Sequence, residues 1–121
     1  MKIKISTRLV FVMKDRVYKF PLSKRGYLQC KNEKKMWDKY GHMNLLGELY
    51  WEKFGIVCMK RYPIAIRIPE YVVKCIKSHI PEFDIARCDL HRVQNWGTDE
   101  KLNPVLIDYG INEYISTLYK C

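Results

Sequence analysis

The chain has 121 residues, 48% of them apolar or aromatic, so it is long enough to fold around one hydrophobic core and too apolar for a disordered chain. Lys and Arg number 22 against 13 Asp and Glu, a formal charge of +9. The excess lies in residues 1–60, because acids and bases are equal in number from Arg61 onward. This surplus favours a polyanionic partner such as a nucleic acid, a nucleotide or an acidic protein surface, with lysines scattered over solvated faces as the alternative.

The cysteines exclude a zinc knuckle. Their number is odd and no two have C-x-x-C spacing; they are Cys30, Cys58, Cys75, Cys88 and Cys121. The chain turns polar directly after Met1, so no signal peptide is expected. Its apolar runs are far too short to cross a bilayer. We therefore expect reduced thiols, a cytoplasmic location and no membrane partner.

The first predicted elements are two strands, over residues 8–13 and 16–22, joined by a tight polar turn. Side chains alternate between the two faces of a strand, so Lys19 shares a face with Val17 and Pro21. Tyr18, Phe20 and Leu22 share the other face, and the pattern predicts a hairpin.

A helix is predicted over residues 27–40, and Gly41 is placed to end it. Glu33, Trp37 and Tyr40 follow one another at i, i+4 and i+7, so the glutamate lies on the apolar stripe. An unpaired buried charge costs several kcal/mol, so this carboxylate is expected to have a partner.

A second hairpin is predicted over residues 45–50 and 54–59, with the polar pair Glu52-Lys53 as the break between its strands. The polar exit at residues 60–63 reads as a linker. It separates a first part, residues 1–60, from a second part, residues 61–121, within one domain.

The second part is predicted to begin with a helix over residues 70–80, which has Pro69 at its first turn. A polar loop, a turn at residues 99–101, a strand over residues 105–107 and a short terminal helix from residue 111 then follow. This order predicts an α+β fold, with a small antiparallel sheet and one helix in the first half and a helix and loop in the second.

Polar residues in the second part carry the chemical signal. Asp89 and Asn95 lie close together in the loop, and the apolar strand ends in Asp108-Tyr109-Gly110. With the strand lysine Lys19 and the inward Glu33, this combination resembles the protein-kinase-like fold, including its aminoglycoside and choline kinase branches. The segments Asp-Leu-His, Asn-Trp-Gly and Ile-Asp-Tyr-Gly are similar to sequence motifs of small kinase-like proteins encoded by bacteriophages. Element order resembles that family over the whole chain, and motifs over these short segments only.

The resemblance implies a site for ATP and Mg²⁺. It gives Lys19 the α- and β-phosphates and Glu33 the task of holding that lysine. It makes Asp108 a Mg²⁺ ligand and Asn95 the ligand of a second metal ion. Asp89 would orient or deprotonate the substrate hydroxyl.

Four further residues have more general interpretations. Gly110 would let the backbone turn sharply after the metal ligand. Tyr62 would stack on an adenine or, equally, cap the core. Trp96 is expected in the core rather than as a platform for a base. His91 lacks partners at ligand spacing, so a zinc site there is not expected.

Each of these candidate site residues also has an ordinary structural interpretation. Lys19 alone reads as a surface lysine, and Glu33 as a carboxylate near a helix N-terminus. Asp89 with its neighbours reads as an Asx turn. Asp108 reads as the end of a strand that enters a turn. The agreement of order, face and spacing favours the joint interpretation.

The sequence also departs from the kinase pattern. The hairpin over residues 9–18 has no glycine, so its backbone N–H groups are less free to cradle a phosphate. The H-R-D triplet reads Arg87-Cys88-Asp89, and Asp89 is six positions from Asn95, one more than in the family. The residues after Gly110 contain no A-P-E motif.

These departures favour a degenerate kinase-like protein, of phage or bacterial origin, that binds a nucleotide, a host partner protein or both. The first alternative is an active minimal phosphotransferase that depends on Mg-ATP. The second is a basic domain that binds nucleic acid, which depends on charge alone. A homodimer that completes the short second part is a further expectation.

Overall fold

The computed structural model describes residues 2–79, 90 and 92–110. Its main sheet is antiparallel, with the strands in the order β1-β2-β3-β5-β4. These strands are β1 (Lys2–Ile5), β2 (Arg8–Val12), β3 (Arg16–Pro21), β4 (Leu49–Lys53) and β5 (Ile56–Lys60). The helices are α1 (Lys24–Tyr40) and α2 (Glu70–His79), and a second small sheet pairs β6 (Trp96–Thr98) with β7 (Pro104–Leu106). The predicted α+β class is confirmed, with a larger sheet than expected.

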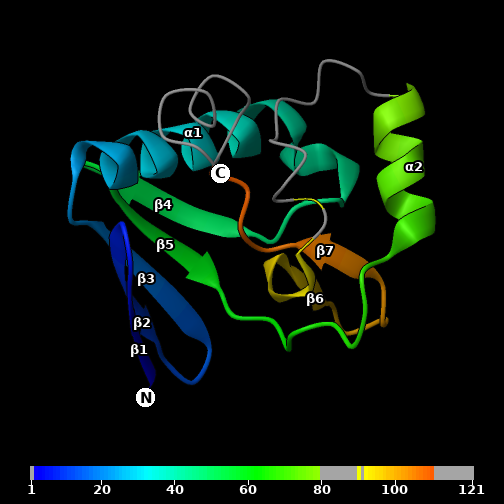
Figure 1. Cartoon of the computed structure of the whole chain (residues 1–121), viewed down its shortest axis with the longest axis horizontal. Coiled ribbons are helices and arrows are strands. Elements are labelled where there is room, and N and C mark those ends of the chain that lie inside the picture. Colours follow the sequence, from blue (N-terminus) through cyan, green and yellow to red (C-terminus); the bar gives the residue numbers. More distant parts are fainter. Residues whose placement is uncertain (1, 80–89, 91, 111–121) are drawn as a thin grey trace.

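Helix α1 lies along one face of the main sheet, where it contacts β3, β4 and β5 (Figure 1). It begins three residues earlier than predicted, because the Ser23 side chain accepts a hydrogen bond from the Gly26 N–H at 3.1 Å and caps the first turn. It ends at Gly41, as expected, where the backbone N–H bonds the Trp37 carbonyl. The helix turns Glu33 fully inward, which confirms the predicted burial of this carboxylate.

The predicted hairpin is formed by β2 and β3. Its register pairs Val10 with Lys19 and Arg8 with Pro21. Residues two apart share a face, so Arg8 and Lys19 lie on the same face of the sheet, and both are buried. The sheet thus directs two cations toward α1 from adjacent strands.

Strand β1 was not predicted. It adds to the outer edge of the sheet by pairing with β2, from Lys2 opposite Val12 to Ile5 opposite Leu9. All four of its residues are exposed, so the strand contributes little to the core.

The second hairpin is present, but its strands and its turn lie further along the chain than predicted. Glu52 and Lys53 are strand residues of β4, and the turn lies at Phe54-Gly55. Both turn residues have positive φ, 53° and 83°, which matches the twist of a two-residue hairpin. The Gly55 N–H also bonds the Glu52 carboxylate at 2.8 Å. Charge alone marked the wrong pair as the turn, because an edge strand accepts charged residues.

The β6–β7 hairpin lies beside the main sheet and is tied to both of the segments that flank β4 and β5 (Figure 1). The Leu106 amide donates to the Leu45 carbonyl at 2.8 Å, and the Ala65 amide donates to the Trp96 carbonyl at 2.9 Å. Trp96 is fully buried, and its Nε1 donates to the Leu90 carbonyl at 3.0 Å. The expectation that this tryptophan belongs to the core is confirmed.

Helix α2 begins at Glu70, as predicted, directly after Pro69. Its predicted last residue, Ile80, and the predicted terminal helix from residue 111 lie outside the described residues. Within the described part of the chain, no helix has the length and apolar character needed to cross a membrane.

Candidate functional site

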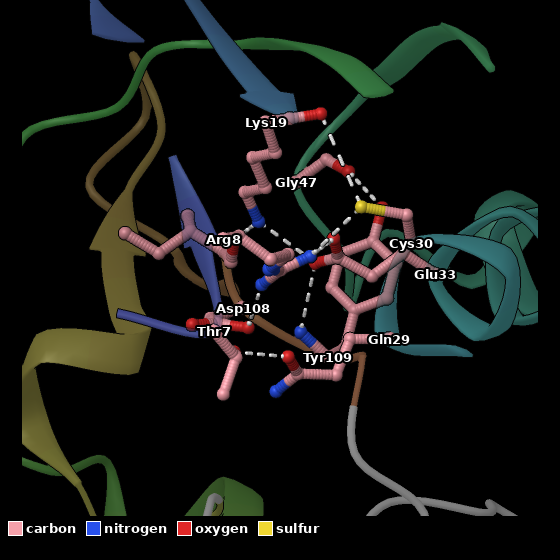
Figure 2. Close-up of polar contacts among 10 residues, drawn as sticks. Thr7, Arg8, Lys19, Gln29, Cys30, Glu33, Gly47, Asp108 and Tyr109 are labelled. Atoms are coloured by element: carbon pink, nitrogen blue, oxygen red, sulfur yellow. Dashed lines mark hydrogen bonds and ion pairs between the residues drawn. The ribbon is translucent and has the colours of Figure 1, made fainter. Parts of the chain in front are cut away.

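Four charged side chains meet where α1 faces the main sheet, and we call them the inner cluster: Arg8, Lys19, Glu33 and Asp108 (Figure 2). They come from β2, β3, α1 and the segment after β7. Lys19 Nζ lies 2.8 Å from Glu33 Oε2, and Arg8 Nη1 bonds Glu33 Oε1. Arg8 Nη2 lies 3.0 Å from Asp108 Oδ1. The two cations and two carboxylates balance in charge, which is the condition for burying them.

Backbone groups complete the cluster and fix the segment that carries Asp108. The Tyr109 N–H donates to Glu33 Oε2 at 3.3 Å, and Lys19 Nζ donates to the Ile107 carbonyl at 3.3 Å. The carbonyl of Asn95 accepts from the Ile107 N–H at 2.7 Å. Strand β3, helix α1 and the chain on either side of the β6–β7 hairpin are therefore joined through one buried polar network.

The cluster holds Asp108 in its charged form. Burial acts to raise the pKa of this carboxyl, but the charges of Lys19 and Arg8 and the Arg8 hydrogen bond lower it, and the Gly110 amide contributes in the same direction. The net result is a lowered pKa. Burial acts to lower the pKa of Arg8, and the negative charges of Glu33 and Asp108 outweigh this, so its pKa is raised.

Two nearby groups remain protonated and act as structural partners. Burial raises the pKa of the Cys30 thiol, whose Sγ lies 3.7 Å from Arg8 Nη1. Burial also raises the pKa of Tyr109 well above its usual value, with the charge of Glu33 as the next cause. The Tyr109 hydroxyl donates to the Gly47 carbonyl at 2.9 Å. Neither group is therefore activated as a nucleophile.

A pocket of about 540 Å³ opens in front of the inner cluster and is lined by Arg8, Lys19 and Asp108. Asn95 and Tyr62 line it as well. Its apolar lining comes from the hairpin, from β5 and from the segments near Ile64 and after β7; these residues are Val10, Val12, Val17, Met59, Ile64 and Ile107. The volume is in the range of small-molecule and cofactor sites.

Six further basic side chains line the pocket, and we call them the outer cations: Lys2, Lys4, Arg25, Lys60, Arg61 and Arg92. They are exposed or half-buried, unlike Arg8 and Lys19. Among the described residues that line the pocket, Asp108 is the only acid. Such a concave surface with one sign of charge concentrates anions.

The structure brings four of the predicted site residues to this pocket, from distant parts of the chain: Lys19, Tyr62, Asn95 and Asp108. Glu33 lies behind Lys19, which it holds, rather than on the pocket wall. The predicted base, Asp89, lies outside the described residues.

Gly110 also lies off the pocket wall, against α1. Its φ is not positive, so the expected sharp turn is not what requires a glycine. A Cβ at this position would lie 2.7 Å from the Gln29 carbonyl oxygen. The close approach to α1 is therefore the physical reason for glycine at this position.

Tyr62 is held against the pocket by its hydroxyl group. The Glu48 N–H donates to this oxygen at 3.1 Å, and Lys60 Nζ lies 5.4 Å from the centre of the ring. Burial raises the pKa of the phenol. The ring is half-buried, so it contributes to the packing and also lines the pocket. Stacking on an adenine stays a prediction.

The donor set fits Mg²⁺ only through a bound phosphate. In the described part of the chain, no group of three or more His, Cys, Asp or Glu side chains is placed to hold a metal ion. Asp108 and Asn95 do line one pocket, and Mg²⁺ commonly binds one or two protein oxygens together with substrate phosphates. Arg8, however, already contacts Asp108 Oδ1. The Mg²⁺ site stays a prediction.

Arg8 is the site residue that sequence reasoning missed. An arginine at the first position of a strand is expected at the surface, because arginine side chains are mostly exposed in proteins. The register of the hairpin shows that Arg8 faces inward. Arg8, Val10 and Val12 lie on the same face of the sheet as Val17 and Lys19 on the neighbouring strand. The contact of Glu33 with two buried cations could therefore be predicted only once the residues of the two strands had been paired.

Comparisons of the chain with protein-family models, with curated proteins and with solved structures found no significant match.

Proposed function

We propose that this protein binds a nucleotide, with ATP as the foremost candidate, in the pocket in front of the inner cluster, and that it is a degenerate protein-kinase-like protein. The observation that carries the proposal is the ion pair between Lys19 and Glu33, which opens onto a pocket that also contains Asn95 and Asp108. Four separate elements have to fold together to produce this arrangement.

The position of the ion pair supports this assignment. In protein kinases a lysine on the third strand holds the nucleotide phosphates, and a glutamate of the next helix holds the lysine. Here Lys19 is on β3, Glu33 is on the helix that follows, and the atoms Nζ and Oε2 are 2.8 Å apart. Lys19 is also on the pocket wall, so its charge faces a bound ligand.

The pocket wall has an apolar part and a positively charged part, which together suit a ligand with a flat apolar end and an anionic end. Val10, Val17, Met59 and Ile107 supply an apolar surface suited to a base. Arg8 and Lys19, with the outer cations, supply the positive charge suited to a phosphate chain. A nucleotide combines both parts in one molecule.

Phosphate transfer is the second candidate, because Asn95 and Asp108 line the same pocket as Lys19. The absence of any glycine before Gly26 weighs against it, since the strands that would cover the phosphates lack a flexible backbone. We therefore propose that activity is weak or absent. The phage or bacterial origin and the host-protein partner stay predictions from the resemblance.

A thermal-shift titration tests the proposed function. A ligand that binds only the folded protein stabilises it by RT ln(1 + [L]/Kd), about 2.7 kcal/mol at 100 Kd. We expect ATP to raise the unfolding midpoint more than either adenosine or inorganic triphosphate does, because each of these engages only one wall. Equal shifts with ATP and triphosphate would reduce the pocket to a general anion site. No shift with ATP, with or without Mg²⁺, would contradict nucleotide binding.

Nucleic-acid binding is measured in the same series with a short single-stranded oligonucleotide. The outer cations favour it, because basic side chains around one concavity follow a phosphate backbone. An oligonucleotide that displaces ATP with a steep salt dependence would place the phosphate backbone in this pocket. An oligonucleotide that leaves ATP bound would remove this alternative.

A further inference from the structure

The contact between Arg8 and Asp108 is what sets this pocket apart from a metal site. Arg8 Nη2 lies 3.0 Å from Asp108 Oδ1, and Arg8 Nη1 bonds Glu33 Oε1, so one guanidinium joins both carboxylates of the cluster (Figure 2). The Arg8 side chain is 5% exposed, whereas that of Asp108 is 40% exposed toward the pocket side. A fixed positive charge therefore stands beside the carboxylate to which the kinase resemblance assigns Mg²⁺.

We propose that Arg8 serves as a built-in counter-cation, so that the pocket binds the phosphates of a nucleotide without a divalent metal ion. This inference rests on the proposed function and specifies its chemistry. Arg8 is fixed between two carboxylates and lines the pocket, so its charge is present before any ligand arrives.

The charges of the pocket wall support this chemistry. Eight basic side chains line the pocket against one acid, Asp108, among the described residues. Glu33 and Asp108 balance the charges of Arg8 and Lys19, so the excess positive charge of the wall comes from the outer cations. A Mg²⁺ ion requires negatively charged oxygens and loses its water reluctantly, so this excess and a carboxylate already engaged by arginine oppose its entry. The same excess attracts a phosphate chain. The pocket wall thus favours the binding of a phosphate chain over the binding of the Mg²⁺ ion that usually accompanies it.

The chemistry of the donors supports it as well. A guanidinium has five N–H donors in a planar fork, which matches a carboxylate or a phosphate. Arg8 directs its two terminal nitrogens to different carboxylates and still lines the pocket. Lys2 and Lys4 line the pocket from β1, near the glycine-free strands. We therefore assign to these side-chain cations the phosphate contacts that backbone N–H groups and a metal ion make in protein kinases.

Calorimetric titration of ATP into the wild-type protein tests the inference, once in EDTA and once in millimolar Mg²⁺. We expect the dissociation constant in EDTA to be equal to that in Mg²⁺ within about threefold, or lower. Binding that appears only with Mg²⁺ would overturn the inference and leave nucleotide binding intact. No binding in either buffer would overturn both.

Asp108→Asn separates the two kinds of site. Without a metal, removal of a negative charge beside the phosphates keeps or strengthens ATP binding in EDTA. A metal-dependent site would instead lose affinity by about tenfold or more in Mg²⁺. The variant keeps the shape of the side chain, and a matched variant, Asp99→Asn, changes the same group in the β6–β7 turn, which does not line the pocket. A loss of affinity in Mg²⁺ confined to Asp108→Asn would contradict the inference.

Arg8→Lys provides the complementary test. It keeps one positive charge but cannot contact Glu33 and Asp108 with two nitrogens. We expect ATP affinity in EDTA to fall by about tenfold, and added Mg²⁺ to restore part of it, because Asp108 Oδ1 is released. Unchanged affinity in EDTA would show that Arg8 does not serve the phosphates. If this variant does not fold, the wild-type and Asp108→Asn titrations still decide the question.

Discussion

The inner cluster and the outer cations line or support the same pocket, and they differ in charge balance and burial. In the inner cluster, Arg8 and Lys19 are matched by Glu33 and Asp108, and three of the four side chains are buried. The six outer cations are exposed or half-buried, and one of them, Lys60, bonds Glu100 at 2.5 Å. The inner cluster is therefore enclosed by the fold, whereas the outer cations lie on the more exposed part of the pocket wall.

This difference has an energetic basis. A buried charge that loses its partner keeps the cost of desolvation without the compensating attraction. An exposed charge that is removed changes stability little, because water and salt already screen it. Variants of the inner cluster should therefore change both stability and affinity, and variants of the outer cations should change affinity alone.

The largest effect is expected for Glu33→Gln. It leaves Arg8 and Lys19 buried with one carboxylate between them, so we expect the free energy of unfolding to fall by about 3–5 kcal/mol in urea denaturation. The control is Asp38→Asn on the exposed face of the same helix. Its ion pair with Lys34 spans one helical turn and is worth about 0.3–0.5 kcal/mol. Similar losses for both variants would contradict the special position of Glu33.

The next effect is expected for Lys19→Met, which keeps an apolar stem and removes the ammonium group from the pocket wall. We expect ATP affinity to fall by about tenfold or more, about 1.4 kcal/mol, because a charge-assisted contact with phosphate is lost. Lys53→Met, on the exposed edge strand β4, is the matched control. Equal ATP affinity in these two variants would remove Lys19 from the site.

A smaller effect is expected for the double variant Lys2→Gln and Lys4→Gln. Both side chains are exposed on β1, so stability should change by less than about 0.5 kcal/mol. Their charges line the pocket, so ATP affinity should fall by about threefold at low salt, and the difference should disappear at high salt. A large loss of stability would show that the outer cations are also part of the fold.

The smallest effect is the dependence of stability on pH through Asp108. Its folded-state pKa is lowered, so its contribution is present above the unfolded value of about 3.9 and is lost as the pH falls toward the folded value. Asp108→Asn should therefore flatten the decline in stability over this acidic range. If the free energy of unfolding of the two proteins changed equally with pH over this range, Arg8 and Lys19 would not stabilise the charged carboxylate.

The sequence predicted the inner cluster in part, and the reason lies in periodicity. Glu33 was identified because it occupies an apolar helical stripe, whereas Lys19 was identified through its resemblance to the strand lysine of kinases. Arg8 was missed because its partner carboxylate is 25 positions away and its neighbour across the sheet, Pro21, gives no charge signal. Its burial depends on pairing between strands, which no single segment contains.

The errors in the sheet have a similar origin. Strand β1 shows only that Lys and Ile alternate, with every residue exposed, so no hydrophobic pattern marks it as part of a core. The turn at Phe54-Gly55 was missed because a phenylalanine with positive φ contradicts local preference. Gly110 was identified for the wrong reason, since its proximity to Gln29 is a tertiary contact.

Nucleotide binding in front of the inner cluster is tested most directly by an amide NMR titration of the ¹⁵N-labelled protein with ATP. We expect the largest shifts at Lys19, Tyr62, Asn95 and Asp108, which are far apart in sequence and share one pocket. The exposed amides of α1 around Asp38 should stay unchanged. Shifts confined to that helix face, or no shifts at saturating ATP, would contradict a nucleotide site in front of the inner cluster.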